Sequence, residues 1–146
     1  MSEIRVDKIS GKTSANTMTV LAGHATDSTT TTNLEQGLAK VWINVDGTAV
    51  TSDVDTAGVR DSFNVGSIVD VATGKHTINY TNDFVNNDYA IVGIARSPAV
   101  RSGIIQAPTD AESDAAVGSL EFFSTDVGGT PFDLNHLNLV IHGDLA

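Results

Sequence analysis

The sequence contains no cysteine, and this absence removes several kinds of chemistry at once. Disulfides, thiolate zinc sites and cysteine nucleophiles are all excluded. Only 5% of the residues are aromatic, which leaves most of the core to aliphatic side chains. No apolar run approaches the roughly 20 residues of a membrane-spanning helix, and the N-terminus lacks the apolar segment of a signal peptide. We therefore expect a soluble protein that is made in a cytoplasm and does not contact a membrane.

Positive charge is also scarce, with 8 Lys and Arg residues against 18 Asp and Glu residues and a net charge of −10. Neutralising the phosphates of a nucleic acid requires a basic face, so this balance argues against a nucleic-acid partner. The first twelve residues are the exception, because three cations outnumber two acids there. A slightly basic segment ahead of an acidic body is suited to docking on an acidic neighbour.

The residues that are abundant favour β-strands. The chain has 16 Val, 10 Ile and 17 Thr against 8 Leu, and β-branched side chains fit a pleated sheet better than a helix. Its 14 Asp residues against 4 Glu indicate many turns. A length of 146 residues favours a single core. These features predict an all-β fold, a single antiparallel β-sandwich of about seven or eight strands preceded by an extended N-terminal β arm.

The pattern along the chain divides it into an arm at 1–21, a linker at 22–37 and a β-sandwich domain at 38–146. In the arm, apolar and polar residues alternate from Ile4 to Asp7, and a second short strand is expected near 16–21. Two such strands are not stable alone, so the arm is expected to lie on the body or on a neighbouring chain. Its predicted interface residues are Ile4, Arg5, Val6, Lys8 and Ile9.

Within the body, the alternation of apolar residues places Val41, Ile43 and Val45 on one face of a strand that ends at an Asp46-Gly47 turn. A loop at 51–58 precedes the next strand, in which a bulge is expected near Gly66. Residues 89–96 read as a buried strand, and 107–118 as a loop. The other expected strands are 59–71, 76–81, 101–106, 119–124 and 137–142.

The stretch 60–81 gathers Arg, Asp, Ser, Lys and His and raises the question of an active site. Gly74-Lys75 is not a phosphate loop, because His76 follows it and Val69 stands where that motif requires glycine. Asp70 is placed to meet His76 across a hairpin, which we interpret as a surface contact. The four histidines at 24, 76, 136 and 142 are scattered, and no nucleophile elbow is present. We read the stretch as a hairpin whose polar residues face solvent, with no catalytic residue and no cofactor.

Two acidic loops are the alternative functional feature. One holds Asp53, Asp55 and Asp61, and the other holds acids at 110, 112 and 114. Calcium takes several oxygens from such loops, but neither has the EF-hand spacing, so we interpret both as solvated loops and assign no metal ligand. Most of the eight aromatic residues are expected in the core, with one or two exposed members able to stack on sugar.

The run from 39 to 96 resembles a domain of structural proteins from marine tailed bacteriophages. The resemblance rests on the order of a Lys-x-Trp strand ending in Asp/Asn-Gly-Thr, an Arg-x-Ser-Phe-Asn-Val-x-Ser-Ile strand, a glycine turn and a strand in which Asn, Tyr and Val follow in that order. The 48–59 insertion and residues 97–134 depart from that pattern. The matching residues are Lys40, Trp42, Asp46, Gly47, Thr48, Arg60, Ser62, Phe63, Asn64, Val65, Ser67, Ile68, Gly74, Asn87, Tyr89 and Val92.

This resemblance implies a virion protein without enzymatic activity. The first reading is a capsid decoration or cement subunit that assembles as a homotrimer and docks through its arm on the major capsid protein. The alternative is a tail fibre or receptor-binding tip that binds host glycan and contacts tail proteins. A small hydrolase that uses His76 ranks last.

Overall fold

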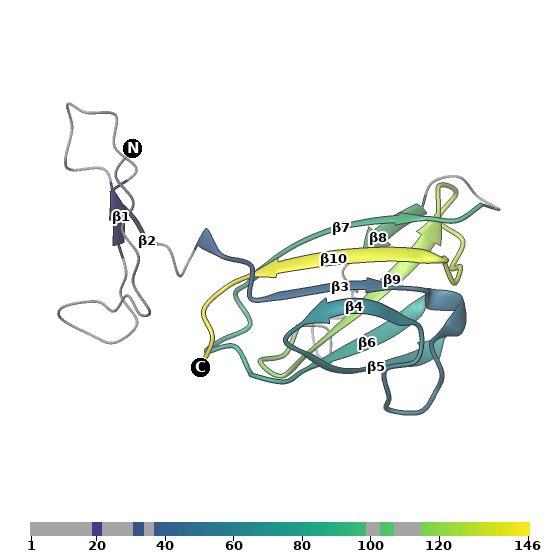
Figure 1. Ribbon diagram of the computed structural model, residues 1–146. Coiled ribbons are helices and arrows are strands. Elements are labelled where there is room, and N and C mark those ends of the chain that lie inside the picture. The colour runs from purple at the N-terminus through teal and green to yellow at the C-terminus, as the bar shows by residue number, and fades with distance from the viewer. Residues whose placement is uncertain (1–18, 22–30, 34–36, 99–102, 107–114) are drawn as a thin grey trace, which may run out of the picture. The chain divides into compact units, whose positions relative to one another are not determined.

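The computed structural model describes residues 19–21, 31–33, 37–98, 103–106 and 115–146 (Figure 1). The chain divides into two compact units, Met1–Leu38 and Ala39–Ala146. In the first unit, β1 (Thr19–Leu21) pairs antiparallel with β2 (Thr31–Asn33). Strand β1 agrees with the second strand expected in the arm, whereas β2 lies where a linker was expected. The strand expected at 4–7 and all five predicted interface residues lie outside the described residues.

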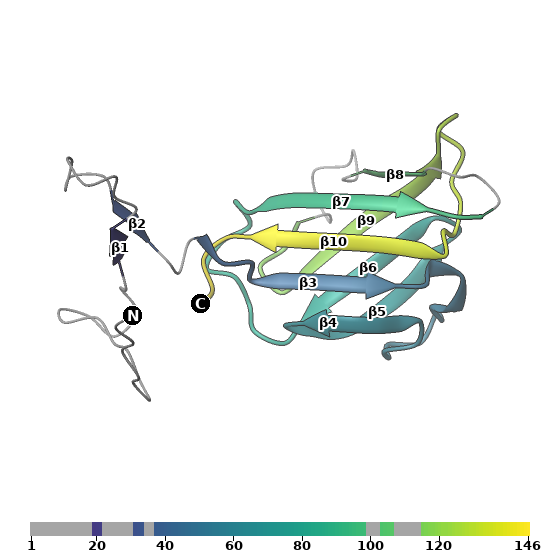
Figure 2. The ribbon, with the colours of Figure 1, turned by 45° about the horizontal axis from the view of Figure 1, so that its top comes forward.

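The described residues of the body form eight antiparallel strands, and the predicted all-β class is confirmed. Their order in the sheet is β4-β3-β10-β7-β8-β9-β6-β5, and Figure 2 shows the first four in front of the last strands of this order. No helix among the described residues is long and apolar enough to cross a membrane. The strands are β3 (Val41–Val45), β4 (Val59–Phe63), β5 (Val65–Ala72), β6 (Lys75–Tyr80), β7 (Ala90–Arg96), β8 (Gly103–Gln106), β9 (Ser119–Asp126) and β10 (His136–His142).

The two layers belong to one sheet that rolls into a nearly closed barrel. Between β7 and β8 the strands share one registered pair, Ala95 with Gly103. The two end strands of the order, β4 and β5, are consecutive in the chain and separated only by Asn64, which has a φ of 58°. Asparagine adopts this left-handed conformation more readily than most residues, so the chain turns there from one layer to the other. The strand expected at 59–71 is therefore two strands, and the bulge expected at Gly66 is present as a register shift between Val65 and Ser67.

The insertion at 48–59 covers the exposed edge of β5. The Ile68 amide donates to the Asp55 carbonyl at 2.8 Å, and the Asp70 amide donates to the Thr51 carbonyl at 2.7 Å. An open strand edge invites pairing with other chains, and these hydrogen bonds occupy part of it. The Asp46-Gly47 turn at the start of this segment forms a short 3-10 helix, η1 (Gly47–Ala49), with Asp46 as its N-cap.

The core lies between the two layers and is formed by alternate residues of the strands. The predicted inward face of β3 is confirmed, since Val41, Ile43 and Val45 are all buried. The prediction of a buried strand at 89–96 is wrong, because side chains of β7 alternate and Val92 and Ile94 are 65% and 68% exposed. The largest fully buried side chains include Phe84, Phe122, Ile43, Ile68, Ile78, Leu120, Leu134, Leu137, Leu139 and Ile141.

The only two tyrosines of the chain meet in this core. The Tyr80 hydroxyl donates to the Tyr89 hydroxyl at 3.2 Å, and the Tyr89 hydroxyl donates to the Ser119 carbonyl at 3.1 Å. The rings pack edge-on at 6.2 Å between centroids, and both contact Phe84. Burial raises the pKa of Tyr80 far above its ordinary value of 10, and the hydrogen bond with Tyr89 and the nearness of its charge add to this. Burial also raises the pKa of Tyr89, against a smaller opposing effect of the same hydrogen bond.

Candidate functional site

A polar pair interrupts the apolar interior of the sheet. Across β5, β6 and β9, one inward row consists of Ile68, Ile78 and Leu120, and all three are buried. The next row is occupied by Asp70, His76 and Phe122. His76 has no exposed surface, and its ring stacks on Phe122 with centroids 5.6 Å apart. The prediction that the polar residues of this hairpin face solvent is therefore wrong for His76.

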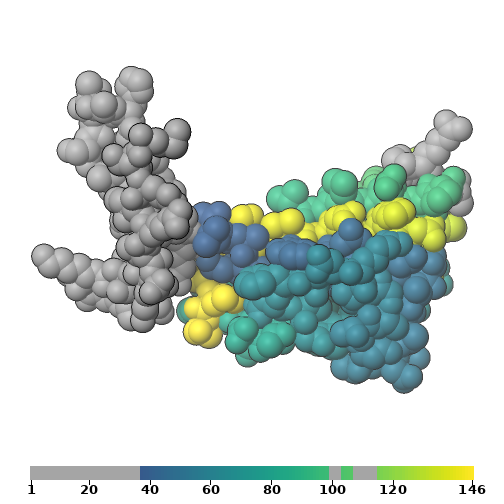
Figure 3. All heavy atoms as spheres, viewed as in Figure 1, coloured from purple at the N-terminus to yellow at the C-terminus, as the bar shows by residue number. Residues whose placement is uncertain are grey.

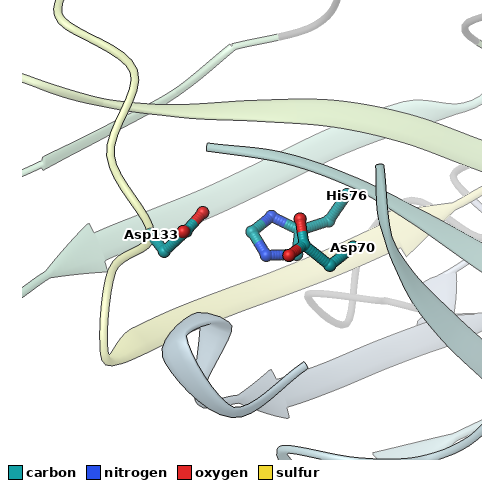
Figure 4. A group of neighbouring side chains, drawn as sticks. All are labelled: Asp70, His76 and Asp133. Carbon is teal, nitrogen blue, oxygen red and sulfur yellow. The ribbon is translucent and has the colours of Figure 1, made fainter. Parts of the chain in front are cut away.

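Asp133 completes a cluster with this pair. It lies in the connection between β9 and β10, and its Oδ1 accepts a hydrogen bond from the Gly74 amide at 2.5 Å. One ligand-type atom each of Asp70, His76 and Asp133 lies within 4.8 Å of the other two. Figure 4 shows the two carboxylate groups flanking the imidazole ring. We call these three residues the Asp-His-Asp cluster.

The surroundings of the cluster fix the orientation of the imidazole. His76 Nε2 lies 3.4 Å from the Gly47 carbonyl oxygen, a long contact in which the nitrogen is the donor because a carbonyl only accepts. An added Cβ on Gly47 would stand 3.4 Å from His76 Cε1 and 2.8 Å from the Leu134 carbonyl oxygen, so η1 packs close to the ring. In the neutral tautomer that makes this contact, the lone pair is on Nδ1.

Two buried polar atoms of the cluster have no hydrogen-bond partner among the described residues, namely His76 Nδ1 and Asp70 Oδ1. Neither Asp70 nor Asp133 forms an ion pair with any other residue that the structure describes. A buried polar atom without a partner is costly, and two neighbouring carboxylates add repulsion to that cost. The cluster therefore has the donor atoms and the charge to hold a cation.

A second unusual feature lies on the opposite side of the sheet, where β4, β3, β10 and β7 face outward. The registered pairs of these strands align a row of four apolar side chains, which are Phe63, Trp42, Val140 and Val92. Ile94 stands beside this row on β7, and Phe63 is 51% exposed. We call these five residues the apolar row. Figure 3 shows the four strands side by side on the surface of the body, with β7 in green, β10 in yellow and β3 and β4 in blue tones.

The acidic loops weighed in the sequence do not form a cluster where they are described. Asp53 is exposed, and the Asp55 carboxylate accepts hydrogen bonds from Thr51 Oγ1 and the Ala57 amide. Asp61 caps the amide of Ser62. The acids at 110, 112 and 114 lie outside the described residues. The structure thus brings Asp70 and His76 together, as the sequence indicated, and adds Asp133.

The remaining candidate residues are dispersed. His136 and His142 lie on β10, and His24 is outside the described residues. Among the described residues, no serine or threonine hydroxyl is hydrogen-bonded to His76. The prediction that most aromatic residues build the core is confirmed for Tyr80, Phe84 and Phe122.

No known protein-family model, curated protein or solved structure matches the chain. The resemblance to bacteriophage structural proteins therefore stays a prediction.

Proposed function

We propose that the chain is a non-enzymatic structural subunit of a bacteriophage particle, most specifically a capsid decoration protein that assembles as a homotrimer. The observation that carries this proposal is the apolar row on the outward face of β4, β3, β10 and β7. The motif order shared with bacteriophage structural proteins supports the assignment to a virion.

The low charge of the apolar row is what allows a second copy to meet the chain there. Two copies with a net charge of −10 each repel one another, so a contact between them needs a face with little charge. Two registered rows on this face span all four strands, and of these the first is entirely apolar and the second contains a single charged residue. That second row consists of Asp61, Asn44, Asn138 and Ile94.

The size of the row indicates that it forms only the centre of the contact. Four strands about 4.8 Å apart, with two rows of side chains about 7 Å apart, give a patch of roughly 250 Å². A stable interface buries about 800 Å² on each partner. The polar rim and the N-terminal arm, whose sequence includes the apolar residues Ile4 and Val6, are the segments proposed to supply the rest.

Light scattering coupled to size-exclusion chromatography tests the proposal on the full chain. We expect a mass near three times 15.2 kDa for the wild type. Val92→Asn combined with Ile94→Asn should shift the protein to monomers that still unfold cooperatively, because both side chains are exposed in the single chain and lie outside its core. Val54→Asn is the matched control, since Val54 is 72% exposed in the 51–58 loop. A wild type that stays monomeric, or a double variant that still forms trimers, would refute the assignment of this face.

A tail-fibre tip that binds host glycan is the second candidate, and one observation favours it. The exposed Phe63 and the half-buried Trp42 are a registered pair on the outward face, and aromatic rings at a surface stack on sugars. A glycan array with the wild type and Phe63→Ser separates the two functions. Quantitative mass spectrometry of virions gives the copy number of the chain, and the copy number indicates its location. A shell offers on the order of hundreds of equivalent sites, whereas a tail offers tens.

A further inference from the structure

We propose that the Asp-His-Asp cluster is a binding site for a divalent transition-metal ion of the zinc type. The ligands are His76 Nδ1, a carboxylate oxygen of Asp70 and the Oδ2 of Asp133. The bound ion holds the β5–β6 hairpin and the β9–β10 connection together at one end of the barrel.

The imidazole is already arranged as a metal ligand. Histidine ligands commonly donate their second ring N–H to a backbone carbonyl, which fixes the tautomer and frees the other nitrogen for the metal. Nε2 of His76 faces the Gly47 carbonyl oxygen at 3.4 Å, and Nδ1 is buried without a partner among the described residues. Because the ring is fully buried and stacked on Phe122, it has little freedom to turn Nδ1 elsewhere.

The two carboxylates come from elements that fix their positions. The Asp70 backbone is held by its registered pair with His76 and by the hydrogen bond from its amide to the Thr51 carbonyl. The chain around Asp133 is held where the Phe132 amide donates to the Ser124 carbonyl and the Gly47 amide donates to the Leu134 carbonyl. Asp133 Oδ1 bonds the Gly74 amide, so Oδ2 is the atom left for an ion.

The spacing fits an ion after a modest contraction. One ligand-type atom from each of the three residues lies within 4.8 Å of the other two. Adjacent ligands of a tetrahedral zinc ion, each about 2.0–2.1 Å from the metal, stand about 3.3 Å apart. The carboxylate oxygens must move by roughly 1.5 Å to go from the 4.8 Å limit to the 3.3 Å ligand spacing, and rotation of the two aspartate side chains provides this movement. Both side chains are only half-buried, so an ion has access.

The donor set selects the class of metal. One imidazole nitrogen with two carboxylate oxygens suits zinc, manganese or iron, whereas calcium and magnesium prefer oxygen ligands alone. Two ionised carboxylates also carry a charge of −2, which an ion of charge +2 cancels. A fourth position would be filled by water.

Thermal unfolding of the untagged full chain, stripped with a chelator and titrated with zinc chloride alone, tests the site. We expect zinc at about 100 times its Kd to raise the Tm by at least about 5 °C. Magnesium chloride should cause no comparable rise. Calorimetric titration should give one zinc per chain.

Asp70→Asn and Asp133→Asn are the informative variants, because each keeps the shape of the side chain. The side-chain oxygen introduced by Asp133→Asn can still accept the hydrogen bond from the Gly74 amide. Both variants should lose the zinc-induced rise. Without metal, Asp70→Asn should melt no lower than the wild type, since it removes one of two unpaired like charges. Asp88→Asn is the control, because Asp88 is exposed and outside the cluster, and its zinc response should equal that of the wild type.

Three results would overturn the proposal. They are a wild type that binds no zinc up to millimolar concentration, variants that respond to zinc as the wild type does, and a metal-free Asp70→Asn that is clearly less stable than the wild type. The last result would show that the aspartate serves the fold through a proton shared with His76. None of these outcomes depends on the oligomeric state proposed above.

Discussion

The hydroxyl pair of Tyr80 and Tyr89 makes the stability of this protein sensitive to alkaline pH in a way that can be calculated. Both groups have a raised pKa in the folded state, chiefly through burial. A tyrosine in the unfolded chain ionises near pH 10. Above that pH the unfolded state releases protons that the folded state retains, so the free energy of unfolding falls as the pH rises. The stabilising contribution is complete below about pH 10 and is lost above it.

The magnitude follows from the linkage relation. For Tyr80, the free energy of unfolding at pH 11 should be about 1.4 kcal/mol lower than at pH 8. Tyr89 should contribute less because it is more exposed. At pH 8, Tyr80→Phe should cost about 1 kcal/mol, because it removes one hydrogen bond from the core. The stability curves of the wild type and Tyr80→Phe should therefore cross between about pH 10 and 11.

Urea unfolding at a series of pH values from 8 to 11 measures both curves. Lysine titration affects the wild type and the variant alike, so their difference isolates Tyr80. Because the chain has only these two tyrosines, phenolate absorbance also reports on them directly and should appear together with unfolding. A stability difference that stays constant with pH, or phenolate that forms near pH 10 in the folded protein, would refute the reasoning.

Three further substitutions test the packing by chemical denaturation. Gly74→Ala should lower the free energy of unfolding by at least about 2 kcal/mol, because Gly74 has a φ of 71° and a Cβ there collides with the Ser124 carbonyl oxygen. An unchanged denaturation midpoint would contradict that geometry. Leu139→Ala, at a fully buried position of β10, should cost about 2–5 kcal/mol, and a loss under about 1 kcal/mol would place Leu139 outside the core. Asp46→Ala should cost only about 1 kcal/mol, since its bonds to the Thr48 amide at 3.2 Å and to Arg60 at 2.8 Å are solvent-exposed.

Much of the fold could be predicted because the strands carry the two-residue period of a half-buried sheet. The inward faces of β3 and β6 follow directly from alternation, as does the bulge at Gly66. Strand β7 could not be read in this way. Its sequence is apolar on both faces, and such a run is typical of a strand buried on both sides. Only the register with β10 shows which side chains of β7 face solvent.

Only part of the Asp-His-Asp cluster could be predicted from the sequence. A hairpin turn at 72–75 places Asp70 opposite His76, and the sequence predicts this pairing. The two-residue alternation with Ile78 and Tyr80 also points His76 inward, but this signal conflicts with the general exposure of polar residues on strands. Asp133 stands 57 residues after His76, and its approach depends on the whole path of β7, β8 and β9. No local pattern encodes that contact.

The two departures from the hydrophobic pattern lie in different layers, and this separation gives a test of both proposals together. Polar Asp70 and His76 face inward on β5 and β6, whereas apolar Val92 and Ile94 face outward on β7. Sites that share no partner contribute additively to stability. The double variant Val92→Asn, Ile94→Asn should therefore keep its zinc response as a monomer, and Asp70→Asn should keep the trimer mass without responding to zinc. If Asp70→Asn also dissociated the trimer, the ion site and the outward face would be coupled through the rolled sheet, and the cluster would act in assembly as well as in stability.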